Sequence, residues 1–527
     1  MLNKSKARTT NTDDNVKSVE EQQVQEDDEF DALLGIGCSN SNADCCRNLE
    51  RWCQQQQLQK KTGPQESYTE HFSWLFSSVM ALVGCKFINQ LAHLMTVSIV
   101  GHLGAKELAG LSLAQMLEKC GAGCFLVGMT SALDTLCGQA WTGAKDKTFI
   151  GLYLQRAIAI YTVMVVPIFT FWAMSLHLLR ESGTDADVAH YAGVYLLFYV
   201  PGMLALAGFH MCGSFLQAQG IMRIGAYGAA LSLPVTATAN YIFVTGRPFK
   251  WGVSGAALAD SMNPITIFTL VVSYTVFVTG RQGWGGWAST KSIFSGWWPI
   301  IRLAASAFCL NLFNSGIPQM CTLTASRFGT TALAAYFILL RTDHTFSAIG
   351  YALKYATITR IGNLMGQGSL ADAKRAIVIG SCLATCIGMA PALVFLVFRQ
   401  KYPYIYTNDD AVAALVSEAL PVVALKQLLN PWNCFIMGIC DGLGRQRVEA
   451  VITFVCYFVI GIPLGYISAF KWGWSIFGLW AGLVIAESVL TVILSLHLCT
   501  LNWSKESRQI KNCIVNQQRQ EASDNNK

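Results

Sequence analysis

Twelve apolar stretches, each about 20 residues long or longer, constrain the fold of this chain more than any other feature. As α-helix, a stretch of that length crosses a hydrocarbon core of roughly 30 Å. Backbone groups in lipid must form hydrogen bonds within their own segment, which a helix allows. Charged residues are 13% of the chain, about half of the roughly 25% typical of soluble domains. We therefore predict an all-α polytopic membrane protein with helices near residues 74–99, 107–133, 149–178, 190–216, 221–245, 253–279, 298–324, 330–357, 373–397, 411–438, 447–469 and 474–500.

The chain also repeats itself, with glycine and proline at matching places in its two halves. The matching pairs are Gly104 with Gly329, Gly138 with Gly362, Pro167 with Pro391, Gly220 with Gly444, and Arg223 with Arg447, and FKWG occurs at Phe249–Gly252 and again at Phe470–Gly473. Glycine and proline mark helix kinks and close helix approaches. We therefore predict two six-helix lobes of one design, related by pseudo-two-fold symmetry about an axis along the membrane normal.

These features divide the chain into five parts. We predict a disordered cytosolic N-tail at 1–72, an N-lobe at 73–280 with helices one to six, a connector at 281–297, a C-lobe at 298–500 with helices seven to twelve, and a cytosolic C-tail at 501–527. The N-tail is too polar to bury a core. Lys and Arg in the even-numbered loops and the C-tail outnumber those in the opposite loops, which places both termini in the cytosol. The same bias accounts for most of the formal net charge of +6, so no nucleic-acid partner is predicted.

Motifs for catalysis, metal binding or a cofactor are not found in this sequence. A phosphate-binding G-x-x-x-x-G-K-[ST], an H-E-x-x-H and a nucleophile elbow are all absent, so we expect neither an enzyme nor an ATP-driven pump. Cys120 and Cys124 lie in an apolar membrane segment with no histidine near them in the sequence, so no metal site is predicted. The eighteen cysteines are scattered and predict no disulfide framework. In the N-tail, Cys38, Cys45, Cys46 and Cys53 are either palmitoylation sites or unmodified thiols, and we favour the second.

Several motifs resemble those of a known transporter family. GHLGAKELAG, SALDTLCGQAWTGAKDK, LQAQGIMR, GRQGWGGW, GRQRVEA and GIPLG resemble the eukaryotic multidrug and toxic compound extrusion (MATE) transporters, with the fungal branch nearest. The resemblance runs from about residue 73 to residue 503. It implies twelve helices in two lobes and multidrug or xenobiotic efflux in exchange for protons or sodium. We expect a monomer, in the plasma membrane or the vacuolar membrane, that needs no cofactor.

The sequence departs from this family at three acidic positions. The family typically has two glutamates in the seventh helix and an acidic residue in the tenth. Aligned from RLA at Arg302, these positions are occupied by Asn314, Gln319 and Asn430. An amide cannot bind and release a proton near neutral pH, although it can form a hydrogen bond to a substrate. The resemblance therefore implies that the usual proton-binding carboxylates of the C-lobe are missing here.

Charged residues in the middle of predicted helices are the other candidates for a site. They are Lys86, Glu118, Lys119, Arg341, Asp343 and Lys426. A charge at the bilayer centre costs about 2.5–3.5 kcal/mol on insertion scales, so these groups must face protein or water. We predict that they line a central cavity for substrate and coupling ion, together with Asn89, Asn314, Gln319, Asn430 and Asn433. The alternative is structural pairing, of Lys86 or Lys119 with Glu118 and of Lys426 or Arg341 with Asp343.

Other residues are assigned structural roles. We expect Asp134 to bind backbone amides or Arg223 at the cytosolic end of helix two. Asp260 and Glu487 are interpreted as packing or gating residues. We expect Gly138 and Gly362 to open matching turns after helices two and eight, and Gly220 and Gly444 to do so after helices four and ten.

The sequence thus predicts a secondary active transporter that exports a small organic solute, a xenobiotic or an organic acid, by alternating access in antiport with H⁺ or Na⁺. Two alternatives are a passive anion channel on the same scaffold and a transport-silent membrane protein used for sensing or interaction. In the mid-membrane set, four cations outnumber two anions, which favours an anionic or zwitterionic solute over a permanent cation.

Overall fold

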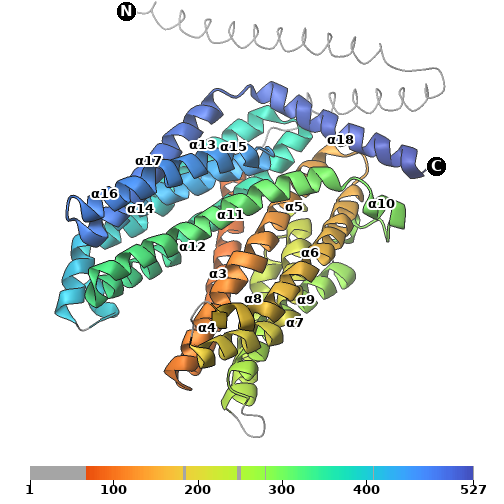
Figure 1. The fold of residues 1–527 in the computed structure, drawn as a ribbon. Helices are drawn as coiled ribbons and strands as arrows, with labels where there is room; N and C mark the ends of the chain where they lie inside the picture. Colours follow the sequence, from red (N-terminus) through yellow and green to blue (C-terminus); the bar gives the residue numbers. More distant parts are fainter. Residues whose placement is uncertain (1–66, 182–184, 246–250, 279, 408, 526–527) are drawn as a thin grey trace, which may run out of the picture. The chain divides into compact units, whose positions relative to one another are not determined.

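The computed structural model describes residues 67–181, 185–245, 251–278, 280–407 and 409–525, and their regular structure is helical throughout (Figure 1). The main helices are α3 (Tyr68–Gly101), α4 (Ala105–Glu118), α5 (Cys124–Gly143), α6 (Phe149–Glu181), α7 (Ala186–Ala218), α8 (Ile224–Asn240), α9 (Val253–Phe277), α11 (Trp297–Ala325), α12 (Thr330–Gln367), α13 (Leu370–Val397), α14 (Asp410–Gly442), α15 (Gln446–Phe454), α16 (Ile462–Phe470), α17 (Ser475–Cys499) and α18 (Trp503–Asn525). The π-helical segments η1 (Lys119–Gly123) and η6 (Val455–Gly461) join α4 to α5 and α15 to α16.

Each of the twelve predicted segments coincides with a helix of the structure. Among the described residues, ten helices are long and apolar enough to cross a membrane. The other two are α8, which is short at 17 residues, and α12, which carries charged residues such as Arg341 and Asp343. Both pack within the bundle, α8 against α3 and α9, and α12 against α5 and α14. The chain therefore has the predicted all-α, twelve-helix, two-lobe architecture.

The first helix begins earlier than predicted. α3 starts at Tyr68 rather than at residue 74, because Ser67 and Glu70 form a capping box at its N-terminus. Residues 1–66 of the predicted N-tail, including its four cysteines, lie outside the described residues. The predicted boundaries of lobes and connector stay predictions.

The internal repeat is visible in the backbone. Gly220 and Gly444 have φ of 82° and 75° in the turns that follow α7 and α14. Gly252 and Gly473, from the two FKWG copies, have φ of 58° and 72° before α9 and α17. Such left-handed conformations favour glycine, so matching turns need it at matching places. Pro167 and Pro391 likewise lie inside the corresponding helices α6 and α13.

Gly138 and Gly362 do not open turns, contrary to the prediction. They lie inside α5 and α12, which continue to Gly143 and Gln367. The two glycines face each other where these helices cross, and a Cβ on Gly362 would lie 3.5 Å from the Gly138 Cα. One turn further along α12, the Gly366 carbonyl would lie 2.9 Å from a Cβ on Gly143. We call these four glycines the interlobe contact, because they bring the second helix of one lobe onto the second helix of the other.

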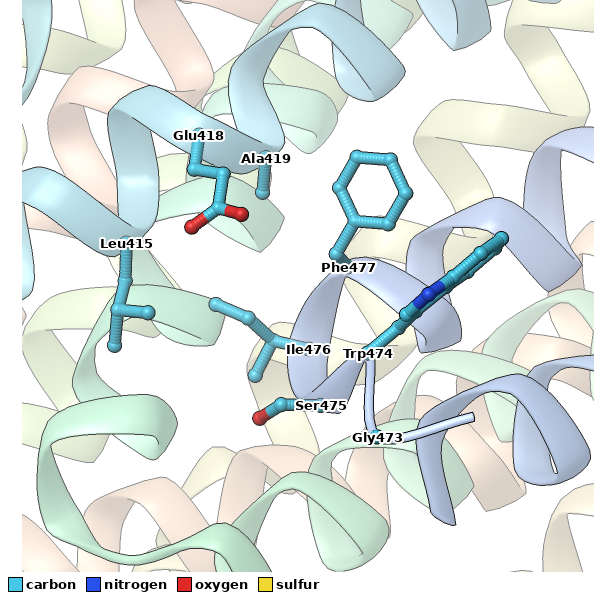
Figure 2. A pocket seen from close by; sticks show the side chains of 8 residues that line it. All are labelled: Leu415, Glu418, Ala419, Gly473, Trp474, Ser475, Ile476 and Phe477. Atoms are coloured by element: carbon cyan, nitrogen blue, oxygen red, sulfur yellow. The ribbon is translucent and has the colours of Figure 1, made fainter. Parts of the chain in front are cut away.

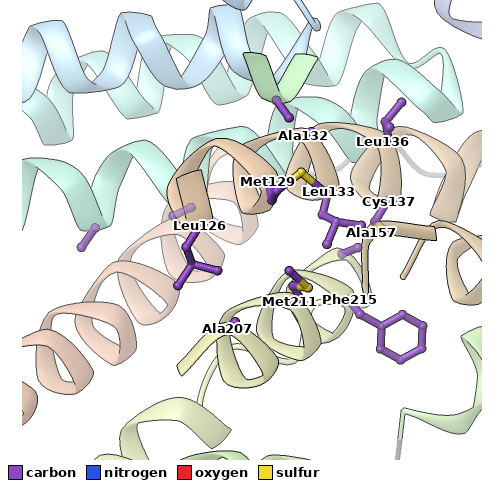
Figure 3. Packing of buried hydrophobic residues seen from close by; sticks show 14 of the residues in the cluster. Leu126, Met129, Ala132, Leu133, Leu136, Cys137, Ala157, Ala207, Met211 and Phe215 are labelled. Carbon is purple, nitrogen blue, oxygen red and sulfur yellow. The ribbon is translucent and has the colours of Figure 1, made fainter. Parts of the chain in front are cut away.

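Helix α5 is the most enclosed part of the bundle. Its apolar side chains, among them Leu126, Met129 and Leu133, are buried against α6 and α7 of the same lobe (Figure 3). The same helix also packs against α11 and α12 of the other lobe. Glycine supports this approach, since a Cβ on Gly128 would lie 2.8 Å from the Ala304 carbonyl oxygen. The core therefore extends from one lobe into the other through α5.

The C-terminal residues form a helix that the sequence analysis missed. α18 buries Ile510 and Ile514, which are one helical turn apart. Near its start, the Glu506 carboxylate binds the Arg445 guanidinium in the turn after α14, and this bond raises the pKa of Arg445. Near its end, Gln517 accepts a hydrogen bond from the Tyr153 hydroxyl of α6. α18 therefore bridges the two lobes at the interlobe contact, where Ile514 reaches Gly143.

Adding one methyl group tests the interlobe contact. A Cβ on Gly366 would clash with the Gln139 carbonyl oxygen, whereas a Cβ on Gly362 finds only ordinary contact distances. We expect Gly366→Ala to lower the thermal unfolding temperature of the purified protein, with an overpacking cost of about 1–3 kcal/mol. Gly362→Ala, on the same helix, should be close to wild type. Equal unfolding temperatures for the two variants would contradict the close crossing.

A charge on the buried face of α18 tests its docking. We expect Ile514→Asp to release the helix, since fully burying one isoleucine contributes about 1.5–3 kcal/mol. The matched control is Asn512→Asp, which adds the same charge to the exposed face. Thermal unfolding and proteolysis of the C-terminus measure the effect. The docked arrangement is wrong if both variants are cleaved as slowly as the wild type.

Candidate substrate and coupling site

An ion-pair cluster lies inside the C-lobe, where α12, α14 and α17 meet. Lys426 Nζ donates hydrogen bonds to Asp343 Oδ1 at 2.8 Å and to Asp343 Oδ2 at 3.0 Å. Glu487 Oε2 lies 3.6 Å from the same nitrogen. All three residues are buried, so a single ammonium group stands between two carboxyl groups. The bond between Lys426 and Asp343 is one of the pairings considered from the sequence. Glu487 was not predicted to belong to this cluster.

Amide side chains complete the cluster. Gln427 Nε2 donates to Asp343 Oδ1 at 2.8 Å and to the Asp343 backbone oxygen at 3.2 Å. Asn433 Nδ2 donates to the backbone oxygen of Glu487 at 3.3 Å, and its Oδ1 accepts from the Thr491 hydroxyl at 2.9 Å. These bonds orient both carboxyl-bearing segments around Lys426. Gln427 is buried and was not among the predicted residues, because an amide gives no charge signal in the sequence.

The three amides at the family's acidic positions lie on two helices. Asn430 is buried on α14, where its Oδ1 accepts a weak bond from the Cys434 thiol at 3.8 Å. Asn314 is half-buried on α11. The side chain of Gln319 lies outside the described residues. Asn430 therefore lies on the same face of α14 as Lys426, whereas Asn314 lies on α11.

Lys86 does not pair with Glu118. Its Nζ lies 5.0 Å from the ring centroid of Tyr355 and 6.0 Å from that of Tyr351, and both rings belong to α12. A cation over an aromatic face is attracted by the electron-rich ring. Lys86 thus reaches from α3 of the N-lobe to α12 of the C-lobe. The nearby Asn89 Oδ1 accepts from Asn263 Nδ2 of α9 at 3.0 Å.

The acidic residues of the N-lobe form a second group. Asp260 Oδ2 accepts from the Tyr195 hydroxyl at 2.6 Å and lies 3.8 Å from His93 Nδ1. Glu118 ends α4 directly before η1, and its electrostatic neighbours are Lys119 and Asp260. Single-turn π segments are frequent at functional sites. Asp260 therefore lies among polar groups, the Tyr195 hydroxyl and His93, rather than in purely apolar packing.

Two exposed cations belong to opposite lobes. Lys119 in η1 and Arg341 in α12 are both exposed. Both act electrostatically on His93 of the N-lobe and on His344 of the C-lobe. Of the predicted mid-membrane cations, these two are exposed in this structure, whereas Lys426 is paired and Lys86 contacts aromatic rings.

Hydrogen bonds flank the interlobe contact. The Thr135 hydroxyl donates to the Asp441 backbone oxygen at 2.7 Å, Gln139 Nε2 donates to the Gly442 oxygen at 2.8 Å, and the Thr142 hydroxyl donates to the Asn363 oxygen at 2.6 Å. All three donors are on α5 of the N-lobe, and all three acceptors belong to the C-lobe. The lobes are thus joined by a few side-chain-to-backbone bonds at this end.

Asp134 lies beside these bonds and does not bind Arg223, contrary to the prediction. It is buried on α5, with Ser214 of α7 in the same lobe and Asp441 and Lys354 of the other lobe as its neighbours. Arg223 is exposed in the turn before α8. The Arg223 alternative was therefore wrong, since Asp134 is buried in the bundle and Arg223 is exposed.

A separate cavity of about 370 Å³ lies at the opposite end of α14 (Figure 2). It is lined by Leu415, Glu418, Ala419, Gly473, Trp474, Ser475, Ile476 and Phe477. Glu418 is its one charged lining residue. Since Lys426, Asp343 and Glu487 do not line it, we do not assign it to the substrate path.

Both halves of the chain match one family of membrane proteins. The family model described as MatE matches residues 72–242 and 305–467, which together are more than half of the chain. "Uncharacterized transporter C4B3.13" from Schizosaccharomyces pombe is 31% identical over 408 residues, covering 77% of this chain and 75% of that protein. "Protein DETOXIFICATION 16" from Arabidopsis thaliana is 30% identical over 449 residues, covering 84% of this chain and 90% of that protein.

Solved structures show the same fold. The eukaryotic MATE transporter AtDTX14 superimposes with a TM-score of 0.76 at 23% identity, covering 85% of this chain and 99% of that one. The bent form of the Vibrio cholerae MATE transporter VcmN gives a TM-score of 0.69 at 17% identity, covering 85% of this chain and 99% of that one. With the family match in each half, these findings show that the chain belongs to the MATE family of membrane transporters.

Proposed function

We propose that this protein exports a small organic solute by alternating access, in antiport with a cation. The observation that carries the proposal is the interlobe contact. There the α5 and α12 backbones meet at four glycines flanked by side-chain-to-backbone hydrogen bonds, α5 also packs against α11, and α18 binds both lobes. Lobes that touch at one end and can part there have the design that alternating access requires. Members of this family are in general secondary active extrusion transporters.

The coupling site that we propose is the cluster of Asp343, Lys426 and Glu487. Two carboxyl groups beside one ammonium group can hold one exchangeable proton, because two buried carboxylates close together repel each other. This cluster offers titratable groups in the C-lobe although Asn314, Gln319 and Asn430 cannot titrate. The coupling ion in this proposal is H⁺, and the Asp260 group of the N-lobe is the second candidate for ion binding.

We also propose an orientation. The distribution of Lys and Arg places both termini in the cytosol, so the interlobe contact and α18 lie on the cytosolic side. The structure then represents a state that is closed toward the cytosol. We propose the plasma membrane or the vacuolar membrane as the location and a monomer as the transporting unit.

The tight interlobe contact supports a transporter over a passive anion channel. A channel needs a continuous aqueous path, whereas α5 and α12 touch through their backbones at this end. Single-channel currents from reconstituted protein would favour the channel instead. Normal folding without flux under any ion gradient would favour the sensor alternative.

Removing the Asp343 charge tests the coupling proposal. We expect Asp343→Asn to abolish acceleration of export by a pH gradient in proteoliposomes, because Lys426 then keeps Glu487 as its permanent counter-ion. The matched control is Glu418→Gln, which removes an exposed carboxyl group from α14. A full pH-gradient response in Asp343→Asn would move coupling to the Asp260 group.

Neutralising the two exposed cations tests the charge of the solute. We expect the wild type to prefer a dicarboxylate over a quaternary ammonium dye of similar size, because Lys119 and Arg341 are exposed positive charges that act on the same two histidines. In the Lys119→Gln, Arg341→Gln double variant, the preference should shift toward the dye. Each unit charge contributes about 1 kcal/mol in water at contact distance, which is roughly a fivefold change. Competition between the dicarboxylate and the dye for export measures this preference. An unchanged preference in the double variant would contradict the role of Lys119 and Arg341 in selecting the charge of the solute.

A further inference from the structure

A second cluster of buried charges lies beside the interlobe contact. Lys354 Nζ of α12 is 3.0 Å from Asp441 Oδ2 of α14 and 3.5 Å from Glu449 Oε1 of α15. The side chains of Asp441 and Glu449 are 2% and 0% exposed. Both carboxyl groups therefore lie beside the same ammonium group. None of these three residues was singled out in the sequence.

The charges in this cluster do not balance if every acid is ionised. One ammonium against two carboxylates leaves one unpaired negative charge, and Asp134 from α5 adds another nearby. Two carboxylates beside one ammonium group in a buried environment cannot both stay ionised at low cost, and such pairs share a proton. With one proton on the pair, Lys354, Asp441 and Glu449 together are neutral.

The hydrogen bonding points to the same proton. Asp441 Oδ1 and Glu449 Oε2 are buried and have no hydrogen-bond donor among the described residues. Leaving buried acceptors unsatisfied is costly. A proton held by one of these carboxyl groups can be donated to the other, which satisfies both. Gln446, whose own Oε1 also lacks a donor among the described residues, lies in the same turn of α15.

The carboxyl pair is attached directly to the bonds that join the lobes. The Asp441 backbone oxygen accepts from Thr135, the next oxygen along the chain accepts from Gln139, and Gln446 Nε2 donates to the Thr135 hydroxyl at 2.8 Å. α5 of the N-lobe therefore binds the α14–α15 turn at Asp441, Gly442 and Gln446, at and between the two members of the pair. A change in the charge of the pair therefore acts directly on the segment that carries these interlobe hydrogen bonds.

We propose that Asp441 and Glu449, held by Lys354, form a proton-binding site whose occupancy stabilises the interlobe contact. The protonated pair is neutral with Lys354 and stays dry between the lobes. When the proton leaves to water, two carboxylates remain beside one ammonium group, and their repulsion and hydration favour separation of the lobes. The other ionisable groups around the pair are Asp134 from α5, Tyr355 from α12, Cys434 and Cys440 from α14, and Arg445 from the α14–α15 turn.

This site is distinct from the proposed coupling cluster. Lys354 is bound by Asp441 and Glu449, whereas Lys426 is bound by Asp343 and Glu487. The proposal concerns separation of the lobes in the protein without solute. It can therefore be tested independently of any export activity, and its failure would leave the proposed function untouched.

The test follows the distance between the lobes as pH changes. Full-length protein in nanodiscs carries one label at Lys145 and one at Ala371, two exposed positions on either side of the interlobe contact. The labels are attached to noncanonical amino acids, because the native cysteines would react. We expect alkaline pH to populate the separated state, by up to tenfold per pH unit for one proton released.

Substitutions show whether the pH-dependent separation of the lobes comes from the carboxyl pair. Glu449→Gln keeps a neutral hydrogen-bonding group and should hold the lobes together at every pH. Glu418→Gln, an exposed carboxyl group at the far end of α14, should respond as the wild type does. A pH response that is unchanged in Glu449→Gln overturns the proposal.

A second readout does not depend on the labels. Infrared spectra of the wild type near neutral pH should contain the carbonyl band of a protonated carboxyl group, and this band should weaken in Asp441→Asn. If Glu449→Gln fails to fold, the infrared measurement still shows whether the carboxyl pair holds a proton. The same band at full intensity in Asp441→Asn, or no such band in the wild type, would show that the pair holds no proton.

Discussion

The architecture depends on how closely α5 can approach α12 and α14. Glycine at Gly138, Gly143, Gly362 and Gly366 removes the side chains that would keep these helices apart, so backbone meets backbone at the crossing. Close approach brings α5 donors within reach of C-lobe carbonyl groups. In a membrane, apolar side chains gain little from leaving lipid for another helix, so close packing and hydrogen bonds must hold the lobes together. Such a contact is specific, because it depends on glycine at these positions.

The sequence predicted the architecture well because its signals are local and long. Each apolar stretch is its own signal for a helix, and the glycines of the repeat mark turns that need positive φ. Helix ends were harder, since α5 and α12 continue to Gly143 and Gln367, past Gly138 and Gly362 where turns were expected. α18 was missed because its apolar signal consists mainly of Ile510 and Ile514 within a polar tail.

The sequence predicted which residues belong to the candidate site, but not which of them bind one another. Mid-helix charges are visible in a sequence, but Asp343 and Lys426 are on different helices, so their bond requires the fold. Glu487 and Lys354 were not placed in a site for the same reason. The sequence count suggested an excess of positive charge, yet the buried lysines Lys354 and Lys426 each bind two carboxyl groups. The positive charge that remains exposed is that of Lys119 and Arg341.

The position of α18 in the chain has a consequence for biosynthesis. A ribosome makes this helix after all twelve spanning helices, and α18 binds Tyr153 of one lobe and Arg445 of the other. Its binding surface is complete only when both lobes are inserted and in contact. Docking of α18 therefore reports that the helices made before it have assembled correctly. A nascent chain with a misplaced lobe keeps Ile510 and Ile514 exposed, as a hydrophobic signal that quality control can recognise.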